Sequence, residues 1–401
     1  MSEQPLSPRR KRRAVTQRLG RADRTPVGTW FWEIDRVLLL LVLVLISIGL
    51  IAVAAASPAA ADRYSHGAFQ IAPLYYFWRQ LIWICLSLPV MIGISMMPKD
   101  SARRIALYGA SFFLMMLVAV PFIGTEVNGA KRWIEFGFWQ FQPSEFLKPL
   151  FVVVVAWLLS LRSRDQSLPV VPMTAALVVL VAVLLMSQPD FGQTVIFGAI
   201  WVAMLTISGF PMRLLGWLGG IAVTGVIAAY LFYSVATERI NKFLFSEGDT
   251  YQTDKAFETL VNGGLFGTGP GAGTMKFRLP EPHTDYIFSV IGEEFGLISC
   301  LAIAIIYLLI VVRVFVRLLH EEDEFLLLAS AGLATEFGLQ ALINMLVNVQ
   351  LAPSKGMTLP FISYGGSSML ALSIGMGLLL AFTRSNPYLA RSPYVVKWSG
   401  R

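Results

Sequence analysis

Long apolar runs recur along most of the chain and are separated by shorter polar segments. Ten runs approach the 20 or so residues that an α-helix needs to cross a hydrocarbon layer about 30 Å thick. We predict membrane spans at residues 36–56, 76–97, 104–124, 146–162, 168–187, 191–209, 212–234, 286–316, 325–350 and 367–384. This pattern predicts an all-α integral membrane protein with about ten transmembrane helices.

The polar connections between the runs are of two kinds. The short ones are basic, which is typical of cytoplasmic loops, and they carry Lys99, Arg103, Arg104, Arg162, Arg164, Arg213, Arg313 and Arg317. The long ones, at residues 125–145, 235–285 and 351–366, then lie outside, the longest between helices 7 and 8. The third holds two prolines and three glycines, which predicts a broken or re-entrant segment before helix 10. Both termini are expected in the cytoplasm.

Composition supports a membrane protein and argues against a nucleic-acid-binding one. Hydrophobic residues make up 56% of the chain and charged residues 14%, which is more apolar than a soluble domain of this size. The net charge of +7 lies in loops and in a tail, so membrane orientation explains it better than nucleic acid does. Cys85 and Cys300 both fall in apolar spans, so we predict neither a disulfide framework nor a cysteine metal site.

The chain divides into one membrane domain and two tails. Residues 1–34 are basic and lack apolar clusters, which predicts a disordered cytoplasmic tail. Residues 35–388 form the membrane domain, and 389–401 a cytoplasmic C-terminal tail. A signal peptide is not expected, because the first apolar run is too long and others follow it. Two uses of the basic tail stay open: contact with anionic lipid or with an acidic partner.

The strongest local signal is the sequence PEPHTDYIF at residues 280–288. A carboxylate at the border of a span is partly desolvated, which raises its pKa toward the range of a general base. Asp285 is therefore the predicted base. The alternative, which capping preference by itself favours, is that Thr284 or Asp285 merely caps the following helix.

Charged residues also mark the entry to the fourth span. Glu145 and Lys148 fall on one helix face at i and i+3, and an ionisable residue inside a span is a functional candidate. Two other interpretations stay open: a pair that only satisfies itself, or Lys148 extending to the membrane interface.

Two further candidates lie in outer turns. Lys355 sits in the broken segment, and its ammonium suits a diphosphate, although an ordinary re-entrant turn is an alternative. Asp190, in the short turn after the fifth span, either orients a basic partner or caps the next helix; we favour the cap.

Glycines cluster at residues 263–273 without the context of a nucleotide-binding loop, since no Walker sequence and no strand precede them. We expect them to provide tight turns and close backbone approach to a ligand. Glu293 and Glu294 follow in the next span, as buried polar groups to which the sequence gives no role.

Several of these motifs together resemble the shape, elongation, division and sporulation family over residues 36–388. The sequences that carry the resemblance are RWI at 132–134, QPSE at 142–145, QPDFG at 188–192, PEPHTDYIF at 280–288, GEEFG at 292–296 and KGMTLPFISYGGSS at 355–368. The wording of the last motif and the long basic tail resemble the division branch more than the elongation branch. Gln193, between the usual glycine and threonine, departs from the family pattern.

The resemblance implies ten spans and glycosyl transfer from lipid II outside the cytoplasmic membrane. The family's catalytic aspartate falls on Asp285. The candidate substrate-binding residues are Arg132, Glu145, Lys148, Lys355, His283, Thr284 and Asp190.

From this resemblance we expect two polyprenyl-linked substrates whose diphosphates lie near Arg132, Lys148 and Lys355. Asp285 would take the proton of the acceptor hydroxyl. A divalent cation, Mg²⁺ or Mn²⁺, could assist at the diphosphate, but the chain offers no carboxylate cage, so no metal ligand is predicted and no cofactor is certain.

The expected partners are lipid II, the growing glycan strand, a class B penicillin-binding protein and other membrane proteins of the division machinery, at the septum of the inner membrane. Two alternative functions stay open. A lipid II flippase would depend on charges deep in the spans, and a scaffold for the penicillin-binding protein would not need Asp285.

Overall fold

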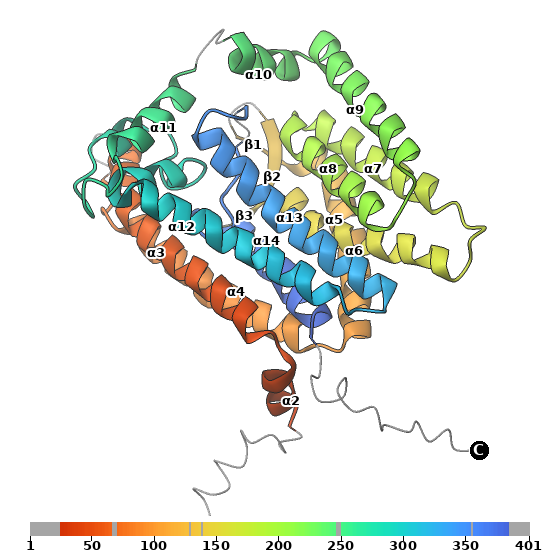
Figure 1. The fold of residues 1–401 in the computed structure, drawn as a ribbon. Helices are drawn as coiled ribbons and strands as arrows, with labels where there is room; N and C mark the ends of the chain where they lie inside the picture. Colours follow the sequence, from red (N-terminus) through yellow and green to blue (C-terminus); the bar gives the residue numbers. More distant parts are fainter. Residues whose placement is uncertain are drawn as a thin grey trace, which may run out of the picture.

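The computed structural model describes residues 25–65, 70–127, 130–137, 139–245, 250–353 and 356–384. Helices dominate this part of the chain (Figure 1). The helices are α2 (Pro26–Glu33), α3 (Arg36–Tyr64), α4 (Tyr75–Met96), α5 (Lys99–Ile123), α6 (Pro143–Ser160), α7 (Val170–Ser187), α8 (Phe191–Ile207), α9 (Met212–Phe232), α10 (Ser234–Phe245), α11 (Tyr251–Asn262), α12 (Ile287–Leu318), α13 (Glu324–Asn348) and α14 (Gly366–Phe382). Short 3₁₀ turns are η1 (Leu161–Ser163) and η2 (Met275–Arg278).

Each of the ten predicted spans falls on one helix, so the multi-pass helical fold class is confirmed. Eight of the described helices are long and apolar enough to cross a membrane. The other two, α8 and α14, have 17 residues each, which corresponds to about 26 Å of helix. That length is at the lower limit for a span, so ten crossings remain a prediction.

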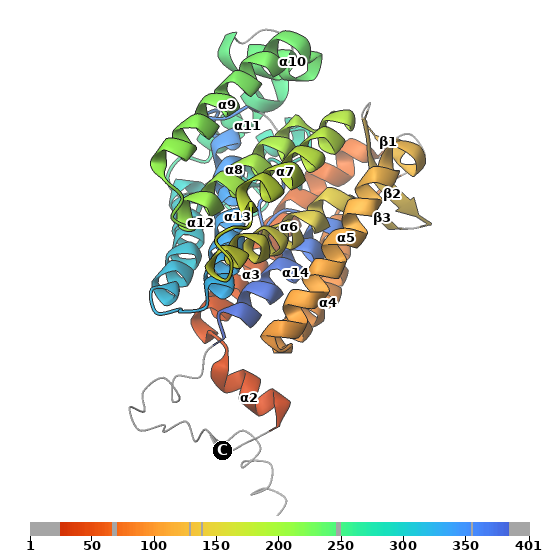
Figure 2. The ribbon, with the colours of Figure 1, turned by 90° about the vertical axis from the view of Figure 1, so that its right-hand side faces the viewer.

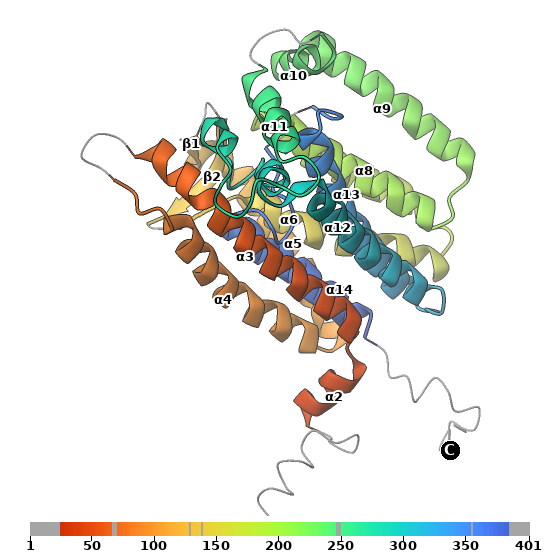
Figure 3. The same ribbon diagram turned by 60° about the vertical axis from the view of Figure 1, so that its left-hand side comes forward.

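The helices differ in how much of their surface the protein itself covers. Of the spanning window, 78% is buried in α6 and 67% in α13, but none in α9, which lies along the outside of the bundle (Figure 3). Small residues allow close packing at the centre, as in other membrane proteins. A Cβ on Gly332 of α13 would lie 2.6 Å from Val152 of α6. The polar residues discussed below lie around this centre.

The bundle has two distinct ends (Figures 1 and 2). We call them the terminal end, where α2 lies and where α14 finishes, and the sheet end, which carries a small β-sheet together with α10 and α11. At the terminal end, Asp35 caps α3 and accepts hydrogen bonds from Arg313 and Arg317 of α12, at 3.0 and 2.8 Å. These bonds hold its pKa below the usual value against the opposing effect of burial.

Helix α2 corrects the expectation that residues 1–34 are disordered throughout. Pro26 stands at the start of this helix, a favoured position for proline, and Thr25 caps it by accepting a hydrogen bond from Gly28 N. Trp30 donates to Ser95 Oγ at 2.9 Å. The structure describes nothing before residue 25, so the rest of the predicted tail lies outside the described residues, as does the tail at 389–401.

The sheet was not predicted. Strands β1 (Thr125–Val127), β2 (Ala130–Phe136) and β3 (Trp139–Phe141) pair antiparallel in the order β1-β2-β3, with Ile134 opposite Phe141. Ala130 and Ile134, on one face of β2, are buried, as the two-residue period of a strand requires. The predicted outer segment 125–145 is thus a folded platform beside α5 and α6 rather than a loop.

The predicted broken segment is confirmed within residues 356–365, which are not helical. Phe361 and Ile362 in it are buried, and its backbone is held by side chains from other helices. Tyr307 of α12 donates to Pro360 O at 2.5 Å, and Gln80 of α4 donates to Ser363 O at 3.3 Å. Irregular backbone at membrane depth is tolerated where protein covers it in this way.

The glycine run packs on the chain itself, which corrects the expectation of a ligand. A Cβ on Gly263 would lie 1.9 Å from Gly292 O, and one on Gly267 would lie 2.2 Å from Glu294 O. Gly263 and Gly267 therefore lie backbone against backbone on the first turns of α12, an approach that only glycine allows.

Candidate functional site

A polar cavity of about 640 Å³ opens at the sheet end, a size typical of ligand sites. Its walls come from α4, the sheet, the start of α6, the turn before α12 and the segment that leads into α14. The charged residues that line it are Arg79, Glu135, Glu145, Glu281 and Asp285, and the aromatic ones are Trp83, Trp133 and Tyr364. Carboxylates, amides and aromatic rings of this kind suit a carbohydrate-bearing ligand.

Asp285 stands on the cavity wall, immediately before α12. Its main chain is fixed, because the carbonyl oxygen accepts hydrogen bonds from Asn344 at 2.9 Å and from Asn348 at 3.2 Å. Its side chain is half-buried. Burial, reinforced by the charges of Glu281 and Glu145, raises the pKa of the carboxyl to about 7. A carboxyl with such a pKa exchanges its proton readily near neutral pH.

The alternative interpretation, a helix cap, is wrong for both candidates. Helix α12 begins at Ile287, its N-cap residue is Tyr286, and no side chain caps it. Thr284 instead donates from its hydroxyl to Glu281 Oε2 at 2.9 Å. Asp285 is therefore not used by the helix that follows it.

The turn before Asp285 is rigid. Glu281 lies between two prolines and has a φ of 52°, a left-handed conformation that costs about 1–2 kcal/mol for a non-glycine residue. Its carboxylate accepts a hydrogen bond from Tyr64 Oη at 2.6 Å, in addition to that from Thr284. Ser363 donates to Thr284 O at 2.7 Å, which ties the turn to the broken segment.

His283 lies behind the cavity wall and does not line it. The ring is buried among Tyr64, Tyr76 and Tyr364, and its centroid is 4.2 Å from that of Tyr76. Burial, partly offset by the charge of Glu281, lowers the pKa of His283 to about 4, so the imidazole is neutral at pH 7. The structure thus brings Thr284 and Asp285 to the cavity and places His283 in a packing position.

Three amides on one face of α13 hold the site together, and the sequence analysis did not predict them. Asn344 bridges the carbonyls of Asp285 and Met357, the latter at 2.6 Å, and Asn348 accepts from Ser289 Oγ at 2.7 Å. The third is Gln340. Polar residues spaced by four inside an apolar run are the signal that could have revealed them.

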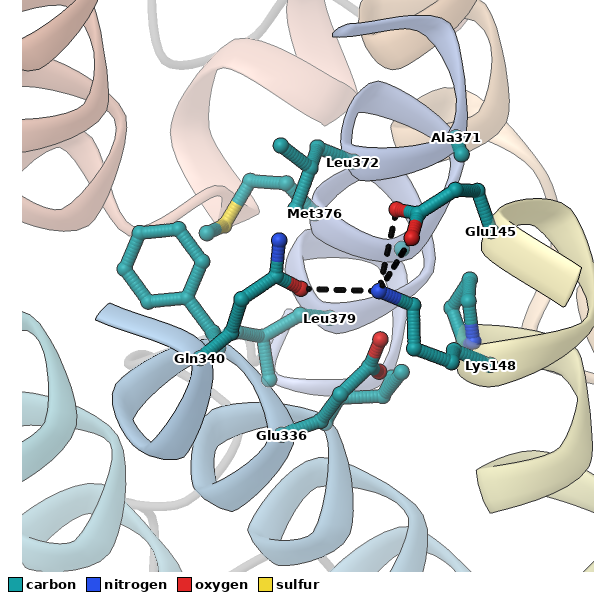
Figure 4. A pocket seen from close by; sticks show the side chains of 12 residues that line it. Glu145, Lys148, Glu336, Gln340, Ala371, Leu372, Met376 and Leu379 are labelled. Atoms are coloured by element: carbon teal, nitrogen blue, oxygen red, sulfur yellow. Dashed lines mark hydrogen bonds and ion pairs between the residues drawn. The ribbon is translucent and has the colours of Figure 1, made fainter. Parts of the chain in front are cut away.

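Glu145 and Lys148 do form the predicted pair, in the first turns of α6. Lys148 Nζ donates to both oxygens of Glu145 at 2.9 Å and to Gln340 Oε1 at 3.1 Å (Figure 4). Lys148 is only 1% exposed, so it does not extend to the interface. Glu145 also accepts from Gln193 at 2.6 Å, which gives a local role to the residue that departs from the family pattern. Glu145 lines the large cavity, whereas Lys148 does not.

A second carboxylate, Glu336, belongs to the same interior cluster and was missed by the sequence analysis. It is buried on α13 and reaches toward Lys148 (Figure 4). With Lys148 and Gln340 it lines a small space of about 20 Å³, room for roughly one water molecule. A glutamate in the middle of a predicted span was the available signal.

Arg132 points away from the cavity. Its Nε donates to Gln188 O at 3.0 Å, and its Nη2 donates to Pro189 O. These carbonyls end α7, where a cation is favourable. Arg132 thus fastens the sheet to the α7–α8 turn.

Asp190 confirms the favoured cap. It is the N-cap residue of α8, and its Oδ1 accepts from Gln193 N at 3.2 Å. Its Oδ2 accepts from Gln142, a cavity residue, at 3.2 Å. Lys355 lies outside the described residues.

Glu293 and Glu294 acquire a structural role. Glu293 accepts backbone hydrogen bonds from residues 274–276 at 2.7–2.9 Å, and buried Glu294 forms an ion pair with buried Lys276. Together they hold in place the segment between α11 and the turn that carries Asp285.

In the described residues, no group of three or more His, Cys, Asp or Glu side chains is arranged to hold a metal ion.

These features define a multi-pass membrane protein with a rigid polar cavity at one end of its bundle. A family model described as "Cell cycle protein", for FtsW, RodA and SpoVE, matches residues 35–388. The chain belongs to this family.

Within the family, the chain is similar to FtsW proteins. A relative from Caulobacter vibrioides, named "Probable peptidoglycan glycosyltransferase FtsW", is 38% identical over 375 residues, which cover 93% of this chain and 95% of that protein. One of the same name from Coxiella burnetii is 34% identical over 332 residues, 78% of this chain and 88% of that protein.

Two solved structures share the fold. A chain from a peptidoglycan synthase complex described as coordinating polymerization and crosslinking matches with a TM-score of 0.70 at 26% identity, over 87% of this chain and 97% of that one. The rod shape determining protein RodA of Thermus thermophilus matches with a TM-score of 0.64 at 25% identity, over 87% of this chain and 96% of that one.

Proposed function

We propose that the chain is a peptidoglycan glycosyltransferase that polymerises lipid II during cell division, with Asp285 as its general base. The names of the FtsW relatives and the likeness to a peptidoglycan synthase complex support the activity. The sheet end would face the outside of the cytoplasmic membrane, where lipid II presents its sugars. The termini would then lie in the cytoplasm.

The position of Asp285 carries its assignment: it is a half-buried carboxyl on the cavity wall, and its surroundings raise its pKa to about 7. Its main chain is fixed, and it caps no helix. A general base works best when its pKa lies near the operating pH. Asp285 takes the proton from the 4-hydroxyl of the acceptor GlcNAc. The oxygen forms a bond to the anomeric carbon of the donor MurNAc, and the bond from that carbon to the diphosphate breaks, so the electron pair leaves with undecaprenyl diphosphate.

The other candidate residues receive different supporting roles. Thr284 and Glu145 line the cavity and are placed to meet the substrate, whereas Lys148 acts through Glu145. His283, Arg132 and Asp190 shape the walls. Lys355 stays a proposed diphosphate ligand next to Gly356, a cavity residue whose Cβ position would be 3.4 Å from Asp285 Oδ2.

A flippase is less well supported. Its pathway would pass through the charged interior at Glu145, Lys148 and Glu336, yet the space there is about 20 Å³, which fits a water molecule and not a disaccharide.

A divalent cation bound with the substrate's diphosphate stays a proposal, and no step above depends on it. A crosslinking transpeptidase of the penicillin-binding class is the proposed partner, together with other division proteins at the septum.

The test is polymerisation of labelled lipid II by the purified protein together with its crosslinking partner. Asp285→Asn removes the base and keeps the size, so we expect loss of glycan strands by about a hundredfold or more. The matched control is Asp62→Asn, an exposed carboxylate at the same end of the bundle that does not line the cavity; it should polymerise as the wild type does. Normal polymerisation by Asp285→Asn would leave the scaffold or flippase as the better account.

A further inference from the structure

The diphosphate of the proposed substrate needs a cation in the cavity. Of the three cations predicted to bind it, Arg132, Lys148 and Lys355, the first two bond to other groups of the protein. The proposed substrate carries a diphosphate, and four carboxylates line the cavity that would receive it. Arg132 donates to backbone carbonyls, and Lys148 is buried against Glu145 and Gln340. Among the described residues that line the cavity, Arg79 is the only lysine or arginine.

Arg79 is held in place without being neutralised. It stands one turn into α4, and its Nη1 donates to Tyr75 Oη at 3.0 Å, with the guanidinium 5.5 Å from the centre of that ring. Within the described part of the chain no carboxylate forms an ion pair with it. A guanidinium has five N–H donors, and the contact with Tyr75 uses one of them. The others remain for a ligand in the cavity.

The position of Arg79 matches a ligand that is charged at one end and apolar at the other. The neighbouring stripe of α4, which faces away from the protein, consists of Trp78, Ile82 and Leu86, and these side chains are 59%, 59% and 55% exposed. Trp83, one turn below Arg79, lines the cavity, and tryptophan favours the boundary between membrane and water. Arg79 thus lies where the polar cavity meets the lipid-facing surface.

We propose that Arg79 binds the diphosphate of the polyprenyl-linked substrate, at the lipid-side rim of the cavity. This inference rests on the proposed function and assigns the diphosphate to a residue that the sequence motifs did not indicate. The planar guanidinium donates two parallel hydrogen bonds to phosphate oxygens, which a lysine cannot do. The polyprenyl chain then extends along α4 into the membrane, and the sugars extend toward Asp285 at the other wall.

A direct measurement of ligand binding tests this assignment independently of catalysis. The full chain in lipid nanodiscs is titrated with undecaprenyl diphosphate and, separately, with undecaprenyl monophosphate. Arg79→Gln should weaken binding of the diphosphate by about tenfold to a hundredfold, the usual effect of losing a charged hydrogen-bonding pair. Arg79→Lys should recover part of this loss, because it keeps the charge and loses the paired hydrogen bonds. The monophosphate should discriminate less between wild type and variants.

The control is Arg63→Gln, which removes an exposed arginine at the same end of the bundle that does not line the cavity. It should bind as the wild type does, and thermal unfolding of each variant should match the wild type. If Arg79→Gln binds undecaprenyl diphosphate normally while the wild type polymerises lipid II, the assignment of Arg79 is wrong and the proposed function stands. If binding depends on Arg79 but no condition yields polymer, the diphosphate site stands and the proposed function fails.

Discussion

Asp285 owes its predicted reactivity to neighbours that do not bond to its carboxyl group. Burial at the cavity wall raises its pKa first, and the charges of Glu281 and Glu145 raise it further. Glu281 is itself fixed by Tyr64 and Thr284, so its charge stays close to the base. The environment thus sets the proton affinity while the backbone bonds from α13 set the position.

The first prediction concerns pH. The carboxylate form of Asp285 is the active one, and its pKa is about 7, so the polymerisation rate should rise as pH increases through about 7 and fall as the group is protonated below it. The measurement is the initial rate with saturating lipid II between pH 5.5 and 8.5. A rate that is flat across this range would contradict Asp285 as the base.

The variant Glu281→Gln sharpens this prediction. Loss of a negative charge that raises the pKa of Asp285 should move the midpoint of the profile to lower pH. Glu135→Gln is the control, because Glu135 lines the same cavity but is not among the charges that shift Asp285; its midpoint should equal that of the wild type.

At this scale the sequence predicted best where a residue's chemistry follows from its place along the chain. Asp285 could be singled out because a carboxylate at the border of a span is exceptional, and the structure places it on the cavity wall; its role as base stays a prediction. Arg132 could not be assigned correctly, because its partners are carbonyl groups of Gln188 and Pro189, far away in the sequence. Whether a cation is free for a ligand depends on such tertiary contacts, which is also why Arg79 was overlooked.

At the scale of elements, α13 is the helix that organises the site. Gln340, Asn344 and Asn348 follow one another at intervals of four and therefore lie on one face. This face bonds to the interior cluster at one end and to the turn before α12 at the other. The helix thus connects the base to the broken segment.

The second prediction is that Asn344→Ala harms both stability and rate. It removes a donor from the buried carbonyl of Met357, which costs about 1–3 kcal/mol, and leaves the carbonyl of Asp285 with the bond from Asn348. A loss of about 1.4 kcal/mol in the transition state corresponds to roughly tenfold in rate. Thermal unfolding in detergent and lipid II polymerisation measure the two effects.

Ser330→Ala is the matched control on the same helix. Ser330 is buried, and its hydroxyl has no hydrogen-bond partner in the described structure, so removing it should be neutral or slightly stabilising. Equal behaviour of Asn344→Ala and Ser330→Ala would show that the amide does not position the site.

The elements themselves were predictable to different degrees. Ten helices follow from apolar runs, because lipid requires internally bonded backbone. The sheet could not be predicted in this way, because β1 and β3 have three residues each, too few to show the alternation of apolar and polar residues that is typical of a strand. The long segment 235–285 was predicted only as an outer connection, and the structure shows that it contains α10, α11 and η2. Glu293 and Glu294 of the next helix hold its latter part in place.

For the whole molecule, the decisive quantity is the number of crossings, because it fixes on which side of the membrane the turn with Asp285 lies. Helix α8 has only 17 residues but is buried within the bundle at Ile196, Phe197 and Ile200. If α8 crosses, the segment that begins at α10 is outside when the N-terminus is inside. If α8 does not cross, the same segment is cytoplasmic, where lipid II polymerisation would have no substrate.

The third prediction therefore tests orientation with two single cysteines in a chain that carries Cys85→Ser and Cys300→Ser. Phe266→Cys lies in the glycine-rich segment, where the native side chain is 80% exposed, and Arg164→Cys lies in the exposed turn between α6 and α7. A membrane-impermeant maleimide should label position 266 in intact spheroplasts and position 164 only after lysis, because three crossings, by α7, α8 and α9, separate these two positions. Labelling of both positions only after lysis would mean that α8 does not cross, and would place the turn that carries Asp285 on the cytoplasmic side, where the proposed reaction cannot occur.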